Sequence, residues 1–180
     1  MSLIIPVHRV ARTLLLPLLA MLLGGCVTKP DAVRPVESFS LERYLGTWYE
    51  IARLDHSFER GLSRVTAHYS LDKDGSVRVV NRGYSEEKQQ WREAVGRALF
   101  VNQPDQGFLK VSFFGPFYGA YVIIDLDEHY RYALVCGPNT SYLWLLARTS
   151  TIPDPVKERL VAKAAGLGFA TSDLIFVKHD

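Results

Sequence analysis

From Gly46 onward the chain is a succession of short segments in which apolar and polar residues alternate, separated by turn residues such as Asp74-Gly75 and Gly137-Pro138. Alternation with a period of two indicates β-strands. The candidate strands are residues 46–54, 64–72, 76–84, 93–102, 108–114, 119–127, 130–137 and 141–149. Strands with mostly short connections predict an all-β fold, either an up-and-down antiparallel barrel or a sandwich, rather than a parallel sheet.

The segment 141–149 has apolar residues on both faces, so its outer face needs a cover. A helix follows directly. Asp154-Pro155 form a typical first-turn pair, and one apolar stripe consists of Val156, Leu160, Ala164 and Leu167. The pattern predicts one C-terminal α-helix packed on the outside of the strands, ended by glycines and followed by a short strand over 173–178.

The N-terminal residues form a different pattern. Arg9 and Arg12 precede an apolar run over 13–23, and two glycines then lead to Cys26. This is the order of regions in a secretory signal peptide, and the apolar run is too short to cross a bilayer as a helix. Residues 1–25 are therefore expected to be removed on export.

The ending Leu23-Gly24-Gly25-Cys26 resembles the lipobox of bacterial lipoproteins, whose cysteine is acylated and becomes the new N-terminus. By this resemblance Cys26 is the lipid attachment site. Val27 at the following position favours sorting to the outer membrane, with the protein anchored on its periplasmic face. The alternative is an ordinary secretory signal with a chance cysteine.

Charge and cysteine content narrow the function. Removing residues 1–25 takes away two arginines and no acids, leaving 19 Lys+Arg against 19 Asp+Glu in a near-neutral chain of one-domain length. No basic cluster suited to phosphates remains, so nucleic acid is not an expected partner. Cys136 would be the one cysteine without lipid, which excludes an intramolecular disulfide framework. Residues 26–38 contain two prolines and no apolar periodicity, and are predicted to be a flexible lipidated tether before a domain at 39–180.

Three segments carry a further resemblance. Gly46-Thr47-Trp48 opens the first strand, Leu126-Asp127 ends the sixth, and Arg148 ends the eighth. In this order and spacing they resemble the three signature regions of the lipocalins. The similarity is closer still to the bacterial outer-membrane lipocalins of the Blc type, over residues 43–62, 110–119 and 133–149. The second signature departs from the commoner Thr-Asp-Tyr, as the bacterial branch does.

The resemblance implies an eight-stranded up-and-down barrel with one closed end. There the Arg148 guanidinium is expected to stack on Trp48, a pairing that contributes roughly 0.5–2 kcal/mol when desolvated. The four signature residues Gly46, Trp48, Asp127 and Arg148 are then structural. The connections 55–63, 85–92, 115–118 and 138–140 form the open end.

Strand alternation then predicts which side chains line the barrel. The expected ligand-binding positions are Ala67, Tyr69, Asn81, Val111, Phe113, Tyr121, Tyr132, Tyr142 and Trp144. Small residues such as Gly96 and Ala98 are expected to leave room, and Leu134 and Cys136 are also placed inward. A barrel of this size holds about one small ligand, and an apolar wall with a few hydroxyls suits a lipid.

Burial of an acyl chain contributes about 0.8 kcal/mol per methylene, so few polar contacts are needed. The predicted ligands are fatty acids and lysophospholipids, with the head group met by tyrosine hydroxyls, Asn81, or the rim residues His56, Arg60 and Arg64. The function hypothesis is a lipid binder that stores or transports acyl lipids for envelope maintenance. The alternative is an envelope-assembly or interaction lipoprotein with a filled barrel, and a homodimer is compatible with either.

Enzyme chemistry finds little support in the sequence. Cys136 lacks a histidine placed to activate it, so a buried inert thiol is the preferred interpretation. Glu50 points inward by alternation and is expected to pair with Arg148 or a hydroxyl. The five histidines are scattered, and no nucleotide-binding motif occurs. The prediction is a protein that is not an enzyme and has no catalytic residue, metal site or cofactor.

Overall fold

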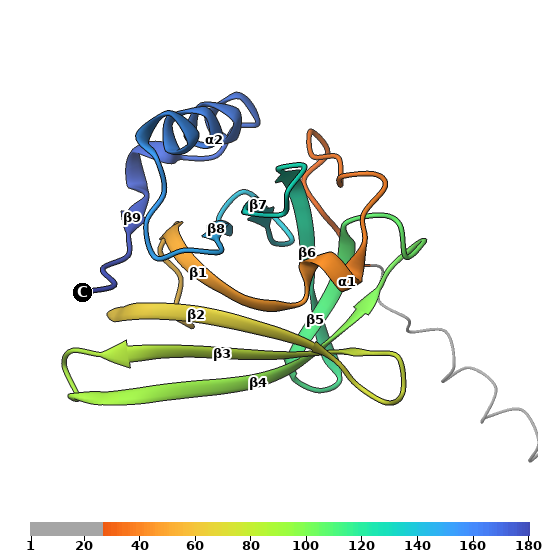
Figure 1. The fold of residues 1–180 in the computed structure, drawn as a ribbon, viewed down its shortest axis with the longest axis horizontal. Coiled ribbons are helices and arrows are strands. Elements are labelled where there is room, and N and C mark those ends of the chain that lie inside the picture. Colours follow the sequence, from red (N-terminus) through yellow and green to blue (C-terminus); the bar gives the residue numbers. More distant parts are fainter. Residues whose placement is uncertain (1–26) are drawn as a thin grey trace, which may run out of the picture.

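The computed structural model describes residues 27–180, so the predicted signal peptide (1–25) and Cys26 lie outside the described residues. Eight antiparallel strands form a closed barrel in which each pairs with the next and β8 pairs with β1 (Figure 1). The strands are β1 (Gly46–Arg53), β2 (Leu62–Leu71), β3 (Val77–Ser85), β4 (Gln90–Phe100), β5 (Phe108–Phe114), β6 (Phe117–Leu126), β7 (Tyr132–Cys136) and β8 (Leu143–Ala147). The predicted up-and-down barrel is confirmed.

The meander gives the barrel two distinct ends. The loops after β1, β3, β5 and β7 lie at the open end, and those after β2, β4 and β6 lie at the closed end. Helix α1 (Leu41–Tyr44) leads into β1 at the closed end. Asp127 fixes the turn between β6 and β7 by accepting hydrogen bonds from the backbone N–H groups of Arg131 and Tyr132.

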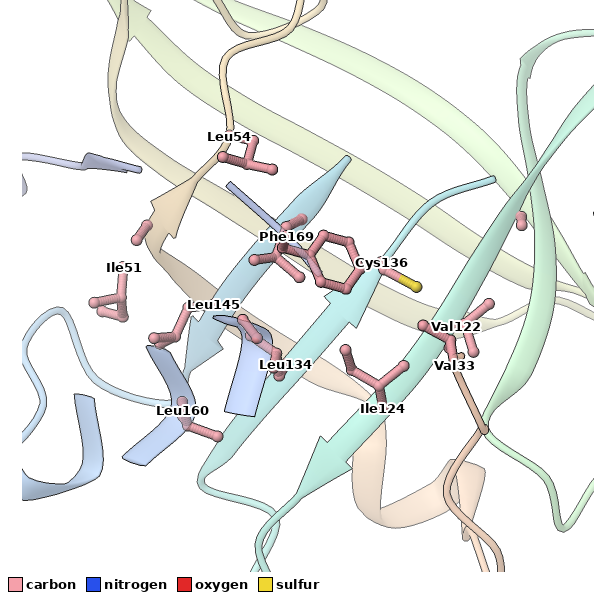
Figure 2. Packing of buried hydrophobic residues seen from close by; sticks show 14 of the residues in the cluster. Val33, Ile51, Leu54, Val122, Ile124, Leu134, Cys136, Leu145, Leu160 and Phe169 are labelled. Atoms are coloured by element: carbon pink, nitrogen blue, oxygen red, sulfur yellow. The ribbon is translucent and has the colours of Figure 1, made fainter. Parts of the chain in front are cut away.

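Helix α2 (Asp154–Gly166) covers part of the outer wall, as predicted. Its residues Leu160 and Ala164 are fully buried against the barrel, and Asp125 of β6 binds both Arg159 and Lys163 of the helix. Figure 2 shows the packing between helix and barrel. We call this the outer cluster; its buried members are Val33, Ile51, Ala52, Leu54, Phe108, Ala120, Val122, Ile124, Leu134, Cys136, Leu143, Leu145, Ala147, Leu160, Ala164 and Phe169.

After the short 3-10 helix η1 (Thr171–Asp173), the chain ends in β9 (Ile175–Phe176), which is shorter than the predicted strand 173–178. It pairs antiparallel with β1, with Phe176 opposite Ala52. This ninth strand adds to the edge of β1 without entering the barrel (Figure 1).

Residues 27–38, predicted as a flexible tether, pack against the barrel. Val33 is fully buried in the outer cluster. Val36 donates its N–H to the carbonyl of Ile123 and accepts a hydrogen bond from the N–H of Gly107. Val33 and Val36 stand between charged residues and prolines, and the segment has neither helical nor strand periodicity. Its sequence pattern therefore did not predict that they are buried.

The strand register shifts at four places, and the shifts in β1 and β6 change the predicted inside–outside alternation. In β1 the pairing with β8 shifts between Glu50 and Ala52, and in β6 the pairing with β7 shifts between Ile123 and Asp125. A bulge inserts one extra residue and changes the face on which the next side chains lie. The bulge at Ile51 turns Arg53 into the barrel, where it pairs across the sheet with inward-facing Trp144.

The inward placement predicted for Tyr132, Leu134 and Cys136 is wrong. Leu134 and Cys136 belong to the outer cluster, and Tyr132 packs against it. The inward residues of β7 are Ala133 and Val135. Both faces of β7 are apolar, so composition did not mark which face lies inside.

Candidate ligand-binding site

The closed end is sealed by a floor of paired side chains. Trp48 is fully buried and donates its indole N–H to the carbonyl of Tyr44 at 2.8 Å. The Arg148 guanidinium lies 4.0 Å from the centre of the Trp48 ring. It also donates to four backbone carbonyls, those of Arg43, Tyr44, Thr47 and Tyr130. The guanidinium therefore stacks on Trp48, as the resemblance implied.

Three tyrosine hydroxyls lie above this floor. The Tyr121 hydroxyl is 2.7 Å from that of Tyr44 and 2.8 Å from that of Tyr69. Burial raises the pKa of all three phenols, so they are neutral donors and acceptors. The three hydroxyls satisfy one another and form a polar layer between the floor and the space above.

A cavity of about 60 Å³ lies inside the barrel. Its walls combine apolar and polar side chains and consist of Glu50, Glu59, Val65, Thr66, Ala67, Asn81, Tyr121, Trp144 and Leu146. The side-chain oxygen of Asn81 is buried there without a hydrogen-bond partner. Space of this size holds about two waters, so a long acyl chain enters only if side chains above it move.

The loop after β1, residues 54–61, closes the top of this cavity. His56 and Glu59 are buried although they belong to a loop. The Trp144 indole donates to the Glu59 carboxylate at 3.0 Å, and His56 Nε2 lies 3.1 Å from the same oxygen. His56, Tyr142 and Trp144 also pack their rings together, with Phe58 at the outside. We call residues 54–61 the lid.

A buried arginine, hydrogen-bonded to a buried glutamate, connects the barrel wall to the lid. Arg53 Nη1 donates to Glu50 Oε1 at 2.7 Å, and Nη2 donates to the backbone carbonyls of Glu59 and Leu62. Arg53 and Glu50 are 2% and 3% exposed, so neither charge is solvated by bulk water. The expected pairing of Glu50 with Arg148 or a hydroxyl is wrong, because the bulge at Ile51 brings Arg53 to it instead.

The two buried carboxylates differ in proton affinity. Burial, and then the charge of Glu59, raise the pKa of Glu50 well above its usual range despite Arg53. Burial opposes ionisation of Glu59 too, but its interactions with His56 and Trp144 outweigh burial and lower its pKa. The opposite directions of the two shifts favour a proton on Glu50 and a negative charge on Glu59.

Most predicted ligand positions do face the barrel interior. Ala67, Asn81, Tyr121 and Trp144 line the cavity, while Tyr69, Val111 and Phe113 belong to the inner packing around it. Tyr142 precedes β8 and lies at the mouth beside the lid. Alternation did not identify Arg53 and Glu59, because a bulge and a loop follow no strand period.

The expected free space at Gly96 is occupied. A Cβ at that position would lie 2.8 Å from the Phe113 ring, so the ring fills the volume that the glycine vacates. At the rim, Arg60 and Arg64 pair with Asp55 and Glu86, which balances their charges.

Cys136 lies away from the cavity, and burial raises the pKa of its thiol to about 12. Such a thiol is not a nucleophile near neutral pH. Within residues 27–180 no group of three His, Cys, Asp or Glu side chains is placed to bind a metal. Nor does any helix in that range have the length and apolar character to span a membrane.

Comparisons with known proteins agree with this architecture. The Lipocalin-like domain family matches residues 39–179. The outer membrane lipoprotein Blc of Vibrio cholerae is 55% identical over 169 residues, covering 93% of this chain and 99% of that protein. The protein of the same name from Escherichia coli K12 is 53% identical over 152 residues, covering 84% of this chain and 86% of its own.

Among solved structures, insecticyanin from the tobacco hornworm Manduca sexta superposes with a TM-score of 0.68 at 19% identity. The match covers 86% of this chain and 87% of that one, and supports the fold alone. Lipocalins bind small hydrophobic ligands and as a family are binding and transport proteins rather than enzymes. The chain belongs to the lipocalin family, within its branch of lipid-anchored outer-membrane lipoproteins.

Proposed function

We propose that this protein binds acyl lipids, namely fatty acids and lysophospholipids, inside the barrel and stores or transports them for envelope maintenance. The observation that carries the proposal is the one-ended interior. The floor of Trp48 and Arg148 is sealed, whereas the other end is covered only by the lid, with a cavity between them. A ligand therefore has one way in.

The wall chemistry favours a chain that enters tail first. Ala67, Val65 and Leu146 offer apolar surface, and each buried methylene contributes about 0.8 kcal/mol. Glu59, a lid residue whose side chain lines the cavity and whose pKa is lowered, would repel a carboxylate that entered it. The head group therefore remains at the mouth, near Arg60 and Arg64.

Lid displacement is the step that makes room. The lid side chains inside the barrel are held by Trp144, Arg53 and the contact between His56 and Glu59. Moving Glu59 outward would join the cavity to the mouth. Ala67, Asn81, Tyr121, Phe113 and Trp144 would then contact the acyl chain, and Tyr142 the head group.

Anchoring is part of the proposal. Lipid on Cys26, after removal of residues 1–25, would hold the barrel at the periplasmic face of the outer membrane, beside a source of acyl lipids. Mass spectrometry of the protein purified from its envelope tests this: the expected N-terminal peptide begins at an acylated Cys26, and a free cysteine there contradicts it.

Binding is tested by filling the cavity. Ala67→Phe places a ring in the space between floor and lid, and His68→Phe places the same ring on the exposed outer face of β2. Titration of delipidated protein with a labelled fatty acid and a labelled lysophospholipid should show at least about tenfold weaker binding for Ala67→Phe alone. Unfolding midpoints of both variants verify that each is folded. Failure of the unsubstituted protein to bind either ligand would overturn the proposal.

The second candidate is an interaction lipoprotein with a filled barrel. The cavity of about 60 Å³ favours it, since Phe113 and the lid occupy much of the interior. Native mass spectrometry of protein from its own envelope separates the two functions. Bound acyl lipid supports the first; a bare barrel with a stoichiometric protein partner supports the second, and the same spectrum reports any homodimer.

A further inference from the structure

The most exposed large apolar side chains within residues 27–180 are three phenylalanines at the open end. Phe117 is 79% exposed, Phe114 76% and Phe58 64%. We call them the rim phenylalanines. Phe114 and Phe117 face each other across the turn between β5 and β6, and Phe58 lies on the lid. Exposed aromatic rings grouped at one end of a fold indicate a contact surface.

Both ends expose charged side chains, but within residues 27–180 no group of exposed rings lies at the closed end. Its loops expose charged residues, among them Asp72, Lys73, Asp74, Asp105 and Glu128. Its exposed large apolar side chain is Leu71, at 55%. The open end is therefore the part of the molecule suited to contact an apolar environment.

A second aromatic group lies on the wall near the open end. Trp91, at the start of β4, is 46% exposed and carries the guanidinium of Arg82 over its ring at 4.2 Å. Arg64 lies over the neighbouring Tyr84 ring at 4.1 Å. Aromatic rings with cations on their faces are suited to the boundary between lipid head groups and acyl chains.

The N-terminal segment holds the proposed lipid anchor close to the barrel wall. Val27 packs on the outer cluster, Val33 is buried within it, and Lys29 is close enough to Cys136 to act electrostatically on its thiol. The residue that follows Cys26 in the chain therefore already packs on the wall of the barrel. A barrel held so tightly to its anchor experiences the bilayer at high effective concentration.

From these observations we propose that the rim phenylalanines insert into the bilayer that holds the anchor, so that the open end of the barrel rests on the membrane. The inference deepens the proposed function: an acyl chain would pass from bilayer to cavity without crossing water. Insertion and acyl binding are separate physical events and are measured separately.

Insertion is measured on the lipidated full chain in vesicles of phosphatidylethanolamine and phosphatidylglycerol. An environment-sensitive fluorophore is attached at Phe117→Cys and, as control, at Lys73→Cys in the closed-end turn; buried Cys136 does not compete for the label. The label at 117 should be quenched several-fold more strongly by acyl-brominated lipids than the label at 73. Equal quenching at the two positions overturns the proposal.

Uptake is measured with Phe114→Ser/Phe117→Ser and with the matched control Leu71→Ser. The double variant should take a labelled fatty acid from vesicles several-fold more slowly, with unchanged affinity for the same ligand in solution. Equal rates in the two variants contradict the inference. A label at 117 shielded by protein, with the double variant turning a dimer into a monomer, assigns the surface to a second copy and also overturns it.

The two proposals fail in different ways. If the unsubstituted protein binds no acyl ligand in solution, the proposed function is wrong, and the quenching at position 117 still decides whether the rim enters the bilayer. If the ligand binds but quenching is equal at both positions, only the membrane inference is wrong.

Discussion

At the closed end of the barrel a cation is surrounded by backbone carbonyls and an indole ring, whereas at the open end a cation is hydrogen-bonded to a buried carboxyl group. Arg148 donates to four carbonyls and stacks on Trp48. Arg53 is bound to Glu50, whose pKa is raised, beneath a lid whose Glu59 has a lowered pKa. The first arrangement contains no carboxyl group, so its stability should depend little on pH. The second contains two coupled carboxylates and changes with protonation.

This difference separates stability from function. Floor side chains are shared among α1, β1, β8 and the β6–β7 turn, so removing one loosens several elements at once. Open-end side chains belong to the lid and hairpin tips, where exposed rings such as Phe117 contribute little to folding. Substitutions of the floor and of the exposed open-end rings should therefore affect different measurements.

The largest effect is expected from Trp48→Ala. The side chain is fully buried and supports the Arg148 guanidinium, so the variant should lose about 3–5 kcal/mol of unfolding free energy, measured by urea denaturation. Phe117→Ala, at an exposed ring, is the control and should change it by less than about 0.5 kcal/mol. A loss of similar size in both variants would show that the two ends do not differ in this way.

Arg53→Met should have the next largest effect. The substitution leaves Glu50 and two backbone carbonyls without their donor. Removing one partner of a fully charged buried ion pair generally costs about 3–5 kcal/mol of unfolding free energy. Because Glu50 already favours its protonated form, we expect a smaller loss of about 2 kcal/mol.

Combining Arg53→Met with Glu50→Gln tests that explanation. The double variant should recover part of the loss, because no carboxylate is left to bury. An unfolding free energy lower than that of Arg53→Met alone would contradict the role given to Glu50.

These side chains also mark the limit of what the sequence could predict. Alternation identified all eight strands, and the resemblance placed Trp48 over Arg148. It did not identify Arg53, because strict alternation from Trp48 and Glu50 puts residue 53 outside. The bulge that reverses this order is an extra residue at Ile51, another apolar residue in an apolar strand. Nothing in that stretch distinguishes it from regular pairing.

The error at Tyr132 has a related cause. A strand covered on both faces is apolar on both, so its composition does not show which side chains point into the barrel. The orientation of these side chains is then set by pairing with the neighbouring strand, and the bulge between Ile123 and Asp125 shifts that pairing by one residue. Likewise, buried His56 and Glu59 lie in a loop, where no periodicity applies. Long-range packing determined these positions.

The pH dependence of stability sharpens the contrast between the ends. An unfolded glutamate titrates near pH 4.3, whereas the folded pKa of Glu50 is raised. Between these values unfolding releases a proton, so stability should fall as pH rises, by up to about 1.4 kcal/mol per pH unit. Glu59, whose pKa is lowered, acts oppositely and loses its contribution only as pH falls below the ordinary carboxyl range.

Urea denaturation from pH 5 to pH 8 measures this slope, and Glu50→Gln should remove most of it. Leu71→Ser, at the closed end, should keep the slope of the unsubstituted protein. A slope that survives in Glu50→Gln assigns the effect to another group.

The smallest effect is expected where the two ends meet, at Tyr121→Phe. Its hydroxyl bonds those of Tyr44 and Tyr69, and its ring lines the cavity. Removing the hydroxyl leaves two buried partners to find water in the cavity, so the unfolding free energy should fall by about 1 kcal/mol. Tyr69→Phe breaks one of the two bonds and should cost less. If Tyr121→Phe also weakens acyl binding, the hydroxyl layer is the base of the pocket; if stability falls and affinity does not, the layer belongs to the floor and the ligand stops above it.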